Sequence, residues 1–121
     1  MEEKTYLAVK VGICDDLEEK LLRYSKEFKI WPEGDPTVKK FFMRGKINGE
    51  EVYTMISDTE GGIVSETDYY NITVTVWGKD REKVIEKMSE LEKNIGIKFK
   101  IPPDTLLLKY RLLGFKPDYS N

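Results

Sequence analysis

Alternating hydrophobic and polar residues mark three stretches of the chain as β-strands. In the first stretch the hydrophobic positions are Leu7, Val9, Val11 and Ile13. Successive side chains of a strand point to opposite faces, so this period of two predicts a strand with one buried face. The same pattern predicts strands over residues 5–14, 70–77 and 97–101.

A two-residue turn joins two further expected strands. Asn48 and Gly49 tolerate the positive φ angles of a type I′ turn, whose twist matches that of the flanking strands. We therefore predict an antiparallel hairpin formed by residues 41–47 and 50–56.

Hydrophobic residues recur at helical spacing in two other stretches. Asp15 is placed to cap the first helix, whose apolar stripe consists of Leu17, Leu21, Tyr24 and Phe28. Asp80 is the expected N-cap of the second helix and Gly96 its C-cap, around a stripe of Val84, Ile85, Met88, Leu91 and Ile95. In the tail, residues 106–113 predict a short helix, with an edge strand as the alternative.

The order of these elements predicts an α+β protein. We expect a mainly antiparallel sheet with two helices packed on one face, ferredoxin-like or a variant of it, followed by a short C-terminal element. The 121 residues contain no internal repeat or linker, so residues 1–121 are expected to form a single domain.

Composition narrows the function. The chain has no His and one Cys, which excludes Ser-His-Asp and Cys-His catalysis and most transition-metal sites. Its formal charge of -2 gives no general attraction to nucleic acid phosphates. The N-terminus is acidic where a signal peptide is basic, and no stretch approaches the roughly 18 apolar residues of a membrane span. We therefore expect a cytoplasmic protein that has no metal or cofactor.

Residues 11–16 end the first strand and begin the first helix with two acids. This Val-Gly-Ile-Cys-Asp-Asp segment resembles the first strand and acidic pair of two-component receiver domains. The resemblance implies Mg²⁺ binding by Asp15 and Asp16, with Asp58 as phosphoacceptor, and Lys100 before Ile101-Pro102 resembles the family's lysine-proline step. A receiver needs a parallel sheet, however, whereas Asn48-Gly49 predicts an antiparallel hairpin just before Asp58.

The sheet face opposite the helices carries the more informative set of side chains. If Leu7, Met43, Ile72 and Phe99 face the helices, the other face carries cations, hydroxyls and large apolar groups: Lys10, Phe42, Arg44, Lys46, Tyr53, Met55, Thr73, Thr75, Trp77, Lys98 and Lys100. Such a surface suits stacking of rings and contact with anions, or burial in a protein interface, where Trp, Tyr, Met and Arg are enriched. Simple solvation under a covering tail is the third interpretation.

These observations favour a non-catalytic binding or regulatory protein. We expect it to act through its open sheet face, by association with a protein or by capture of a small anionic ligand such as a nucleotide, and to form a homo-oligomer. The expected contact residues are Arg44, Lys46, Tyr53, Trp77, Lys98 and Lys100. One alternative is an Mg-dependent carboxylate-based enzyme or receiver-like phosphoacceptor around Asp15, Asp16 and Asp58, and another is an RNA-binding module.

Overall fold

In the computed structural model, the described part of the chain consists mainly of strands and helices. The described residues are 5–25, 29–31, 38–47, 49–59, 70–102, 107–108, 111–112 and 117–118. The elements are β1 (Tyr6–Gly12), α1 (Leu17–Tyr24), β2 (Lys29–Trp31), β3 (Val38–Ile47), β4 (Glu50–Thr59), β5 (Ile72–Gly78), α2 (Arg81–Ile95) and β6 (Pro117–Asp118).

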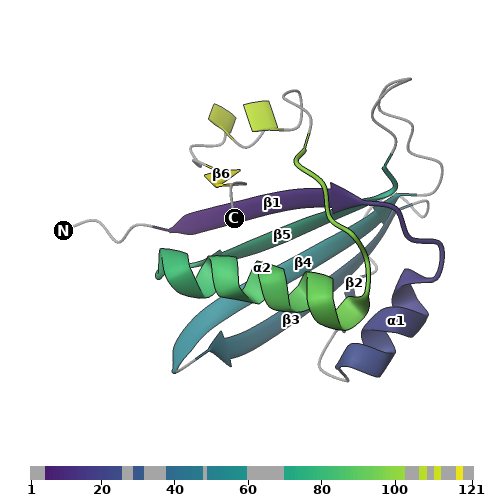
Figure 1. Cartoon of the computed structure of the whole chain (residues 1–121), viewed down its shortest axis with the longest axis horizontal. Helices are drawn as coiled ribbons and strands as arrows, with labels where there is room; N and C mark the ends of the chain where they lie inside the picture. The colour runs from purple at the N-terminus through teal and green to yellow at the C-terminus, as the bar shows by residue number, and fades with distance from the viewer. Residues whose placement is uncertain are drawn as a thin grey trace.

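The strands form one sheet in the order β2-β3-β4-β5-β1-β6 (Figure 1). All neighbours are antiparallel except β1 and the two-residue β6. The predicted hairpin is present: Ile47 is the Cα partner of Glu50, and Gly49 has the positive φ of 87° that the turn requires. Asn48 lies outside the described residues.

Both helices cover the same face of the sheet. Helix α2 packs on β1, β5 and β4, and α1 packs beside α2 at one end of the sheet (Figure 1). One core cluster joins Leu17 and Leu21 of α1 to four apolar residues of α2 and to the sheet residues Ala8, Phe41, Met43, Val52, Ile56, Ile72, Val74 and Val76. The predicted α+β class, with two helices on one face, is therefore confirmed.

The two helices differ at their ends. The Asp80 carboxylate caps α2 by accepting hydrogen bonds from the backbone N–H groups of Glu82 and Lys83, and Gly96 ends it with φ 78°, both as predicted. Helix α1 begins after Asp16 rather than Asp15, and no side-chain hydrogen bond caps it. It ends at Tyr24, whereas Phe28 of the predicted stripe is outside the described residues.

The expected orientation of β1 is wrong. Leu7 is the Cα partner of Trp77, and Ala8 is the partner of Val76, so Ala8 faces the helices and Leu7 faces the other side. For the same reason Lys10, the Cα partner of Val74, belongs to the helix-covered face and not to the open one. Strand β1 is buried on both faces, since Leu7, Val9 and Val11 on one face and Ala8 on the other are all at most 4% exposed. Alternation therefore does not identify the helix side, which here carries the smaller residue Ala8 under α2.

The predicted strand over residues 97–101 is reduced to one antiparallel bridge. The backbone groups of Val11 and Lys100 exchange two hydrogen bonds, of 3.0 and 2.7 Å. In the tail, residues 107–108 and 111–112 are helical, and Leu107 is buried. The ferredoxin-like layout is not confirmed, because β2 and β3 extend the sheet and its expected last strand is only this bridge. Within the described part of the chain, no helix has the length and apolar character needed to cross a membrane.

Candidate functional site

Three of the predicted contact residues stand in one row across the open face. Arg44 of β3 is the Cα partner of Tyr53 on β4, and Tyr53 is the partner of Trp77 on β5. Directly opposite residues of antiparallel strands share a face. The registers of β3 with β4 and of β4 with β5 therefore place a cation and two rings side by side on neighbouring strands.

The rings form a continuous cluster with their neighbours. Tyr53 and Trp77 stack with centroids 5.6 Å apart, and Phe42 lies 6.3 Å from Tyr53 and 6.2 Å from Trp77. Met55, the Cα partner of Phe42, completes what we call the sheet-face cluster: Phe42, Tyr53, Met55 and Trp77. All four side chains remain partly exposed, although aromatic contacts of this kind stabilise a fold by about 0.5–1.5 kcal/mol per pair.

Glu51 holds two members of the row in place. Its carboxylate accepts hydrogen bonds from Arg44 Nε at 3.1 Å and from the Tyr53 hydroxyl at 2.8 Å. These bonds lower the pKa of Glu51, and the hydrogen bond to Glu51 raises the pKa of Arg44. The guanidinium carbon also lies 5.7 Å from the centre of the Tyr53 ring. Arg44 is thus paired with an acid, which weakens its attraction for an external anion.

A cavity of about 360 Å³ adjoins this row. Its walls include Tyr53 and Trp77, and its polar lining comes from Thr5, Glu50, Glu51 and Lys79. The cavity is large enough for a small organic molecule beside the two rings. Its two carboxylates and one ammonium group do not favour an anion.

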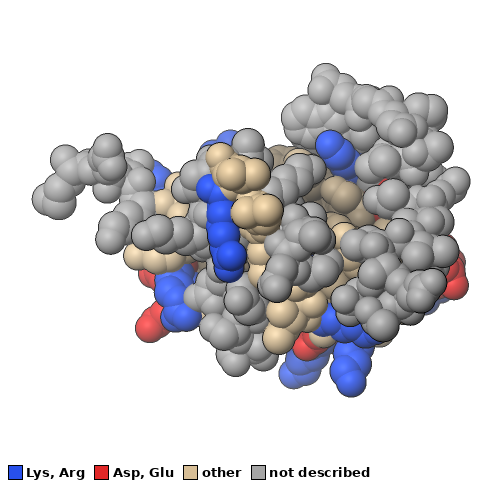
Figure 2. Space-filling model, turned by 90° about the horizontal axis from the view of Figure 1, so that it is seen from above, with Lys and Arg blue, Asp and Glu red and all other residues tan. Residues whose placement is uncertain are grey.

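The four predicted cations do not gather at one place. Lys46 is the Cα partner of Glu51, next to the aromatic row. Lys98 and Lys100 are exposed on the segment that follows α2. This segment lies beside β1, because Lys100 pairs with Val11. Four residues along β1 and four strand spacings separate Lys100 from Arg44, which corresponds to about 13 Å along the strands and about 19 Å across them. On the face seen in Figure 2, the described Lys and Arg side chains likewise lie at separate places.

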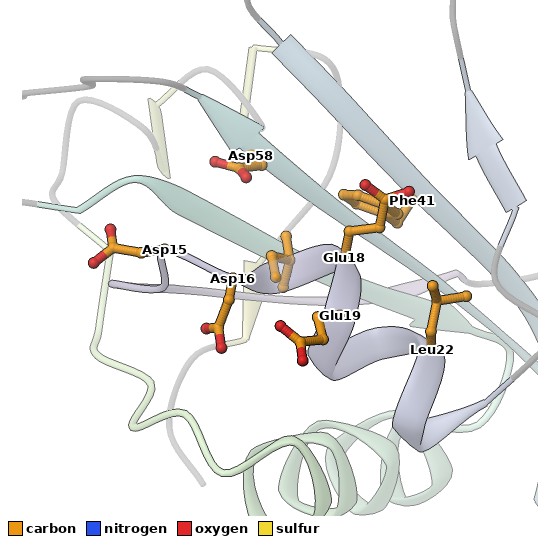
Figure 3. A pocket seen from close by; sticks show the side chains of 8 residues that line it. Asp15, Asp16, Glu18, Glu19, Leu22, Phe41 and Asp58 are labelled. Atoms are coloured by element: carbon orange, nitrogen blue, oxygen red, sulfur yellow. The ribbon is translucent and has the colours of Figure 1, made fainter.

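The acids of the alternative hypothesis do line one cavity, of about 460 Å³. Asp15, Asp16 and Asp58 all border it, together with two glutamates and the apolar side chains Leu17, Leu22 and Phe41 (Figure 3). The carboxylates point in different directions (Figure 3). Among the residues that the structure describes, no group of three such side chains could hold a metal ion. The antiparallel sheet also differs from the parallel sheet that the receiver resemblance requires.

No family model, curated protein or solved structure matches this chain. The site must therefore be interpreted from its own geometry.

The sequence reasoning missed two polar networks on the helix-covered side. The Asn71 side chain accepts a hydrogen bond from the Cys14 N–H at 2.8 Å and donates one to the Cys14 carbonyl at 2.6 Å. Burial raises the pKa of the Cys14 thiol, which lowers the fraction of the reactive thiolate.

The second network joins α1 to α2 through Tyr24, Lys87 and Glu90. Only the inward position of Lys87 was detectable in the sequence, because Lys87 lies three residues after Val84 and four before Leu91, within the apolar stripe of α2. A charged residue at such a position indicates a buried polar partner.

Proposed function

We propose that the protein is a non-catalytic binding protein that associates with another protein surface through its sheet-face cluster. The observation that supports this is the mutual contact of Phe42, Tyr53 and Trp77 on the face that neither helix covers. Partly exposed aromatic rings, Met and Arg on one surface are typical of interface anchors.

A second copy of the chain is the partner that we put forward first. The open face carries both signs of charge close together, with Arg44 and Lys46 beside Glu51, so it is electrostatically compatible with itself. Two sheets can pack face to face at about 10 Å with interleaved side chains. A twofold axis would place the rings of one copy against those of the other.

The test is the assembly state of the wild type and of Trp77→Thr. Threonine already occupies positions 73 and 75 on the same side of β5. A threonine at position 77 therefore suits this side of the strand, and the variant should fold. We expect sedimentation velocity to give a concentration-dependent dimer for the wild type and a monomer for Trp77→Thr. Lys98→Ala, at the other end of the sheet, is the matched control and should remain dimeric.

A wild type that stays monomeric at its highest soluble concentration would contradict self-association. Fluorescence offers a second readout, because the chain has only one other tryptophan, Trp31. In a Trp31→Phe background, the emission of Trp77 should shift to shorter wavelength on association as its ring loses contact with water.

The cavity beside Trp77 and Tyr53 favours a second candidate, the capture of a small ligand with a planar ring. Its glutamates weaken the expectation of an anionic ligand such as a nucleotide. Native mass spectrometry of freshly purified protein separates the two candidates, since a bound small molecule adds mass to each chain and self-association does not.

A further inference from the structure

The open face of the sheet is unevenly charged. Along β3, β4 and β5 the strand register places four charged side chains on this face: Lys40, Arg44, Lys46 and Glu51. Three of them are cations on β3 and one is an acid on β4, which leaves an excess of two positive charges. The whole chain, by contrast, has a formal charge of -2. A surface whose charge is opposite to that of the rest of the molecule indicates a negatively charged partner.

Two lysines carry this excess. Arg44 is engaged with Glu51, whereas neither Lys40 nor Lys46 forms an ion pair with any residue that the structure describes. Lys46 is exposed and Lys40 is partly exposed. Six residues separate them on β3, which corresponds to about 20 Å. Two phosphates of an extended strand can occupy positions this far apart, whereas one small anion cannot reach both lysines.

Trp77 offers the flat surface that a base needs. Tyr53 is covered on both sides, since Trp77 stacks on it from β5 with centroids 5.6 Å apart and the Arg44 guanidinium lies 5.7 Å from its ring centre on the β3 side. Trp77 is the last ring of the series, and the cavity of about 360 Å³ lies beside it. Every nucleobase has a flat face that can stack on such a ring.

The positions of the ring and of the lysines match the two ends of a nucleotide. Trp77 on β5 is two strand spacings, or about 10 Å, from the row of cations on β3. The carboxylate of Glu51 opposes a phosphate inside the cavity but not an uncharged base. A phosphate at Lys40 or Lys46 is placed on the far side of the rings, where the cations are in excess.

We propose that the open face binds single-stranded nucleic acid, with one base in the cavity beside Trp77 and backbone phosphates at Lys40 and Lys46. This proposal rests on the second candidate function, a planar ring in the cavity, and adds the backbone that the lysines would hold. It does not require self-association. A bound strand would cover the surface that a second copy of the chain would use, so the two partners should compete.

The experiment measures binding of labelled single strands of about ten nucleotides, one of RNA and one of DNA, by fluorescence anisotropy. Sodium chloride is varied from about 50 mM to about 200 mM. Each phosphate contact to a single strand contributes a slope of about -0.7 to the plot of log affinity against log salt, so two contacts predict about -1.4. In the Trp31→Phe background, stacking of a base should quench the fluorescence of Trp77.

Three variants locate the strand. Lys40→Gln and Lys46→Gln should each weaken binding and make the salt slope less steep by about 0.7. Trp77→Thr should lower the affinity about tenfold or more and leave the slope unchanged. Lys93→Gln is the matched control, because it removes the same charge from an exposed position on α2 and should bind like the wild type.

Two further measurements separate this proposal from the functions proposed above. Free adenosine and uridine test the cavity alone: if they quench Trp77 but the single strands bind no more tightly, the small-ligand candidate stands and the strand proposal fails. The double variant Lys40→Gln, Lys46→Gln keeps all four side chains of the sheet-face cluster. Its sedimentation therefore reports self-association independently of nucleic acid.

Four results would overturn the proposal. They are the absence of binding at about 50 mM salt, a salt slope that the lysine variants leave unchanged, binding of a duplex as tight as that of the single strand, and equally tight binding of polyglutamate. The duplex keeps its bases paired and stacked, and polyglutamate has none, so either result would assign binding to charge alone. The lysine variants alter only side chains at the surface, so their slopes remain informative even if Trp77→Thr does not fold.

Discussion

The helix-covered face and the open face of the sheet use alternate residues of the same strands. On β5, Ile72, Val74 and Val76 point to the helices and are fully buried, whereas Thr73, Thr75 and Trp77 point the other way and are partly exposed. One face thus contains aliphatic side chains packed as an interior. The other carries hydroxyls and aromatic rings, which pack less completely but offer polar atoms and flat surfaces for contacts with another molecule.

This difference shows that the two faces contribute differently to folding. The helix-covered face supplies the free energy of folding through burial of apolar surface. The sheet-face cluster contributes less to folding and keeps its rings partly exposed, which the proposed association would need. Strand β1 is the exception, since it is buried on both sides. It marks the limit of the open face.

The largest loss of stability should come from truncating a side chain of β4 that faces the helices, compared with truncating its neighbour on the open face. Ile56 is 0% exposed in the core cluster, so Ile56→Ala should lower the free energy of unfolding by about 2–5 kcal/mol. Met55→Ala, on the open face, should cost less because the side chain is partly exposed and water can occupy the space left. Urea unfolding at one protein concentration gives both values. Equal losses for the two variants would mean that a partner already covers the open face.

The sequence predicted the fold well where local rules decide it. Asn48-Gly49 predicted the hairpin, whose register places Arg44 opposite Tyr53, whereas the separate pairing of β4 with β5 adds Trp77 to the row. Asp80 and Gly96 set both ends of α2. These elements depend on turn and capping chemistry, which is local.

Longer-range features escaped prediction. The alternation of residues 97–101 places Lys98 and Lys100 on one side of their segment. Only the pairing of Lys100 with Val11 shows that this segment lies beside β1, away from Arg44 on β3. The orientation of β1 could not be read from Leu7, Val9 and Val11, because both sides of this strand are buried. Side-chain pairs such as Tyr24 with Lys87 join residues 63 positions apart, and no periodicity encodes them.

The second largest loss of stability should follow from Tyr24→Phe, which tests the network of Tyr24, Lys87 and Glu90 between the two helices. The change leaves buried Lys87 without its hydroxyl acceptor, so we expect a loss of about 1–3 kcal/mol at neutral pH. Tyr53→Phe is the matched control: it removes a hydroxyl that hydrogen-bonds Glu51 on the open face, and should cost less. Similar losses in both variants would show that the Tyr24 network adds little.

The pH dependence of the same pair gives an independent readout. The folded chain raises the pKa of Tyr24 above its ordinary value of about 10, so the protonated phenol stabilises the fold fully below that pH. Above it, the unfolded chain ionises first and this stabilisation is lost as the pH rises. The stability difference between wild type and Tyr24→Phe should therefore stay constant up to about pH 9 and narrow as the pH rises above about 10. A constant difference would mean that Tyr24 titrates equally in both states.

A smaller change in the free energy of unfolding, this time a gain, is expected from a substitution at Thr54. This residue is fully buried on the helix-covered face, and its hydroxyl has no hydrogen-bond partner among the residues that the structure describes. Thr54→Val removes an unsatisfied polar group without changing the shape of the side chain, so we expect a gain of about 1 kcal/mol. Thr73→Val, on the partly exposed side of β5, should leave stability nearly unchanged. A loss in Thr54→Val would indicate that an ordered water or a ligand satisfies the hydroxyl.

The smallest effect should come from Mg²⁺, which tests whether the acidic cavity at the rim of the helix-covered face is a functional site. Octahedral Mg²⁺ needs oxygen ligands that converge at about 2.0–2.1 Å from one point. Asp16 already lies 3.7 Å from Lys20 and accepts a contact from the Cys14 thiol at 3.5 Å. The carboxylate of Asp16 also points away from those of Asp15 and Asp58 (Figure 3), so we expect no change in melting temperature on adding about 10 mM Mg²⁺. A rise in melting temperature with Mg²⁺ that is lost in Asp15→Asn but kept in Glu86→Gln would contradict this prediction. It would assign the functional site to the carboxylates beside α1 instead of the open face.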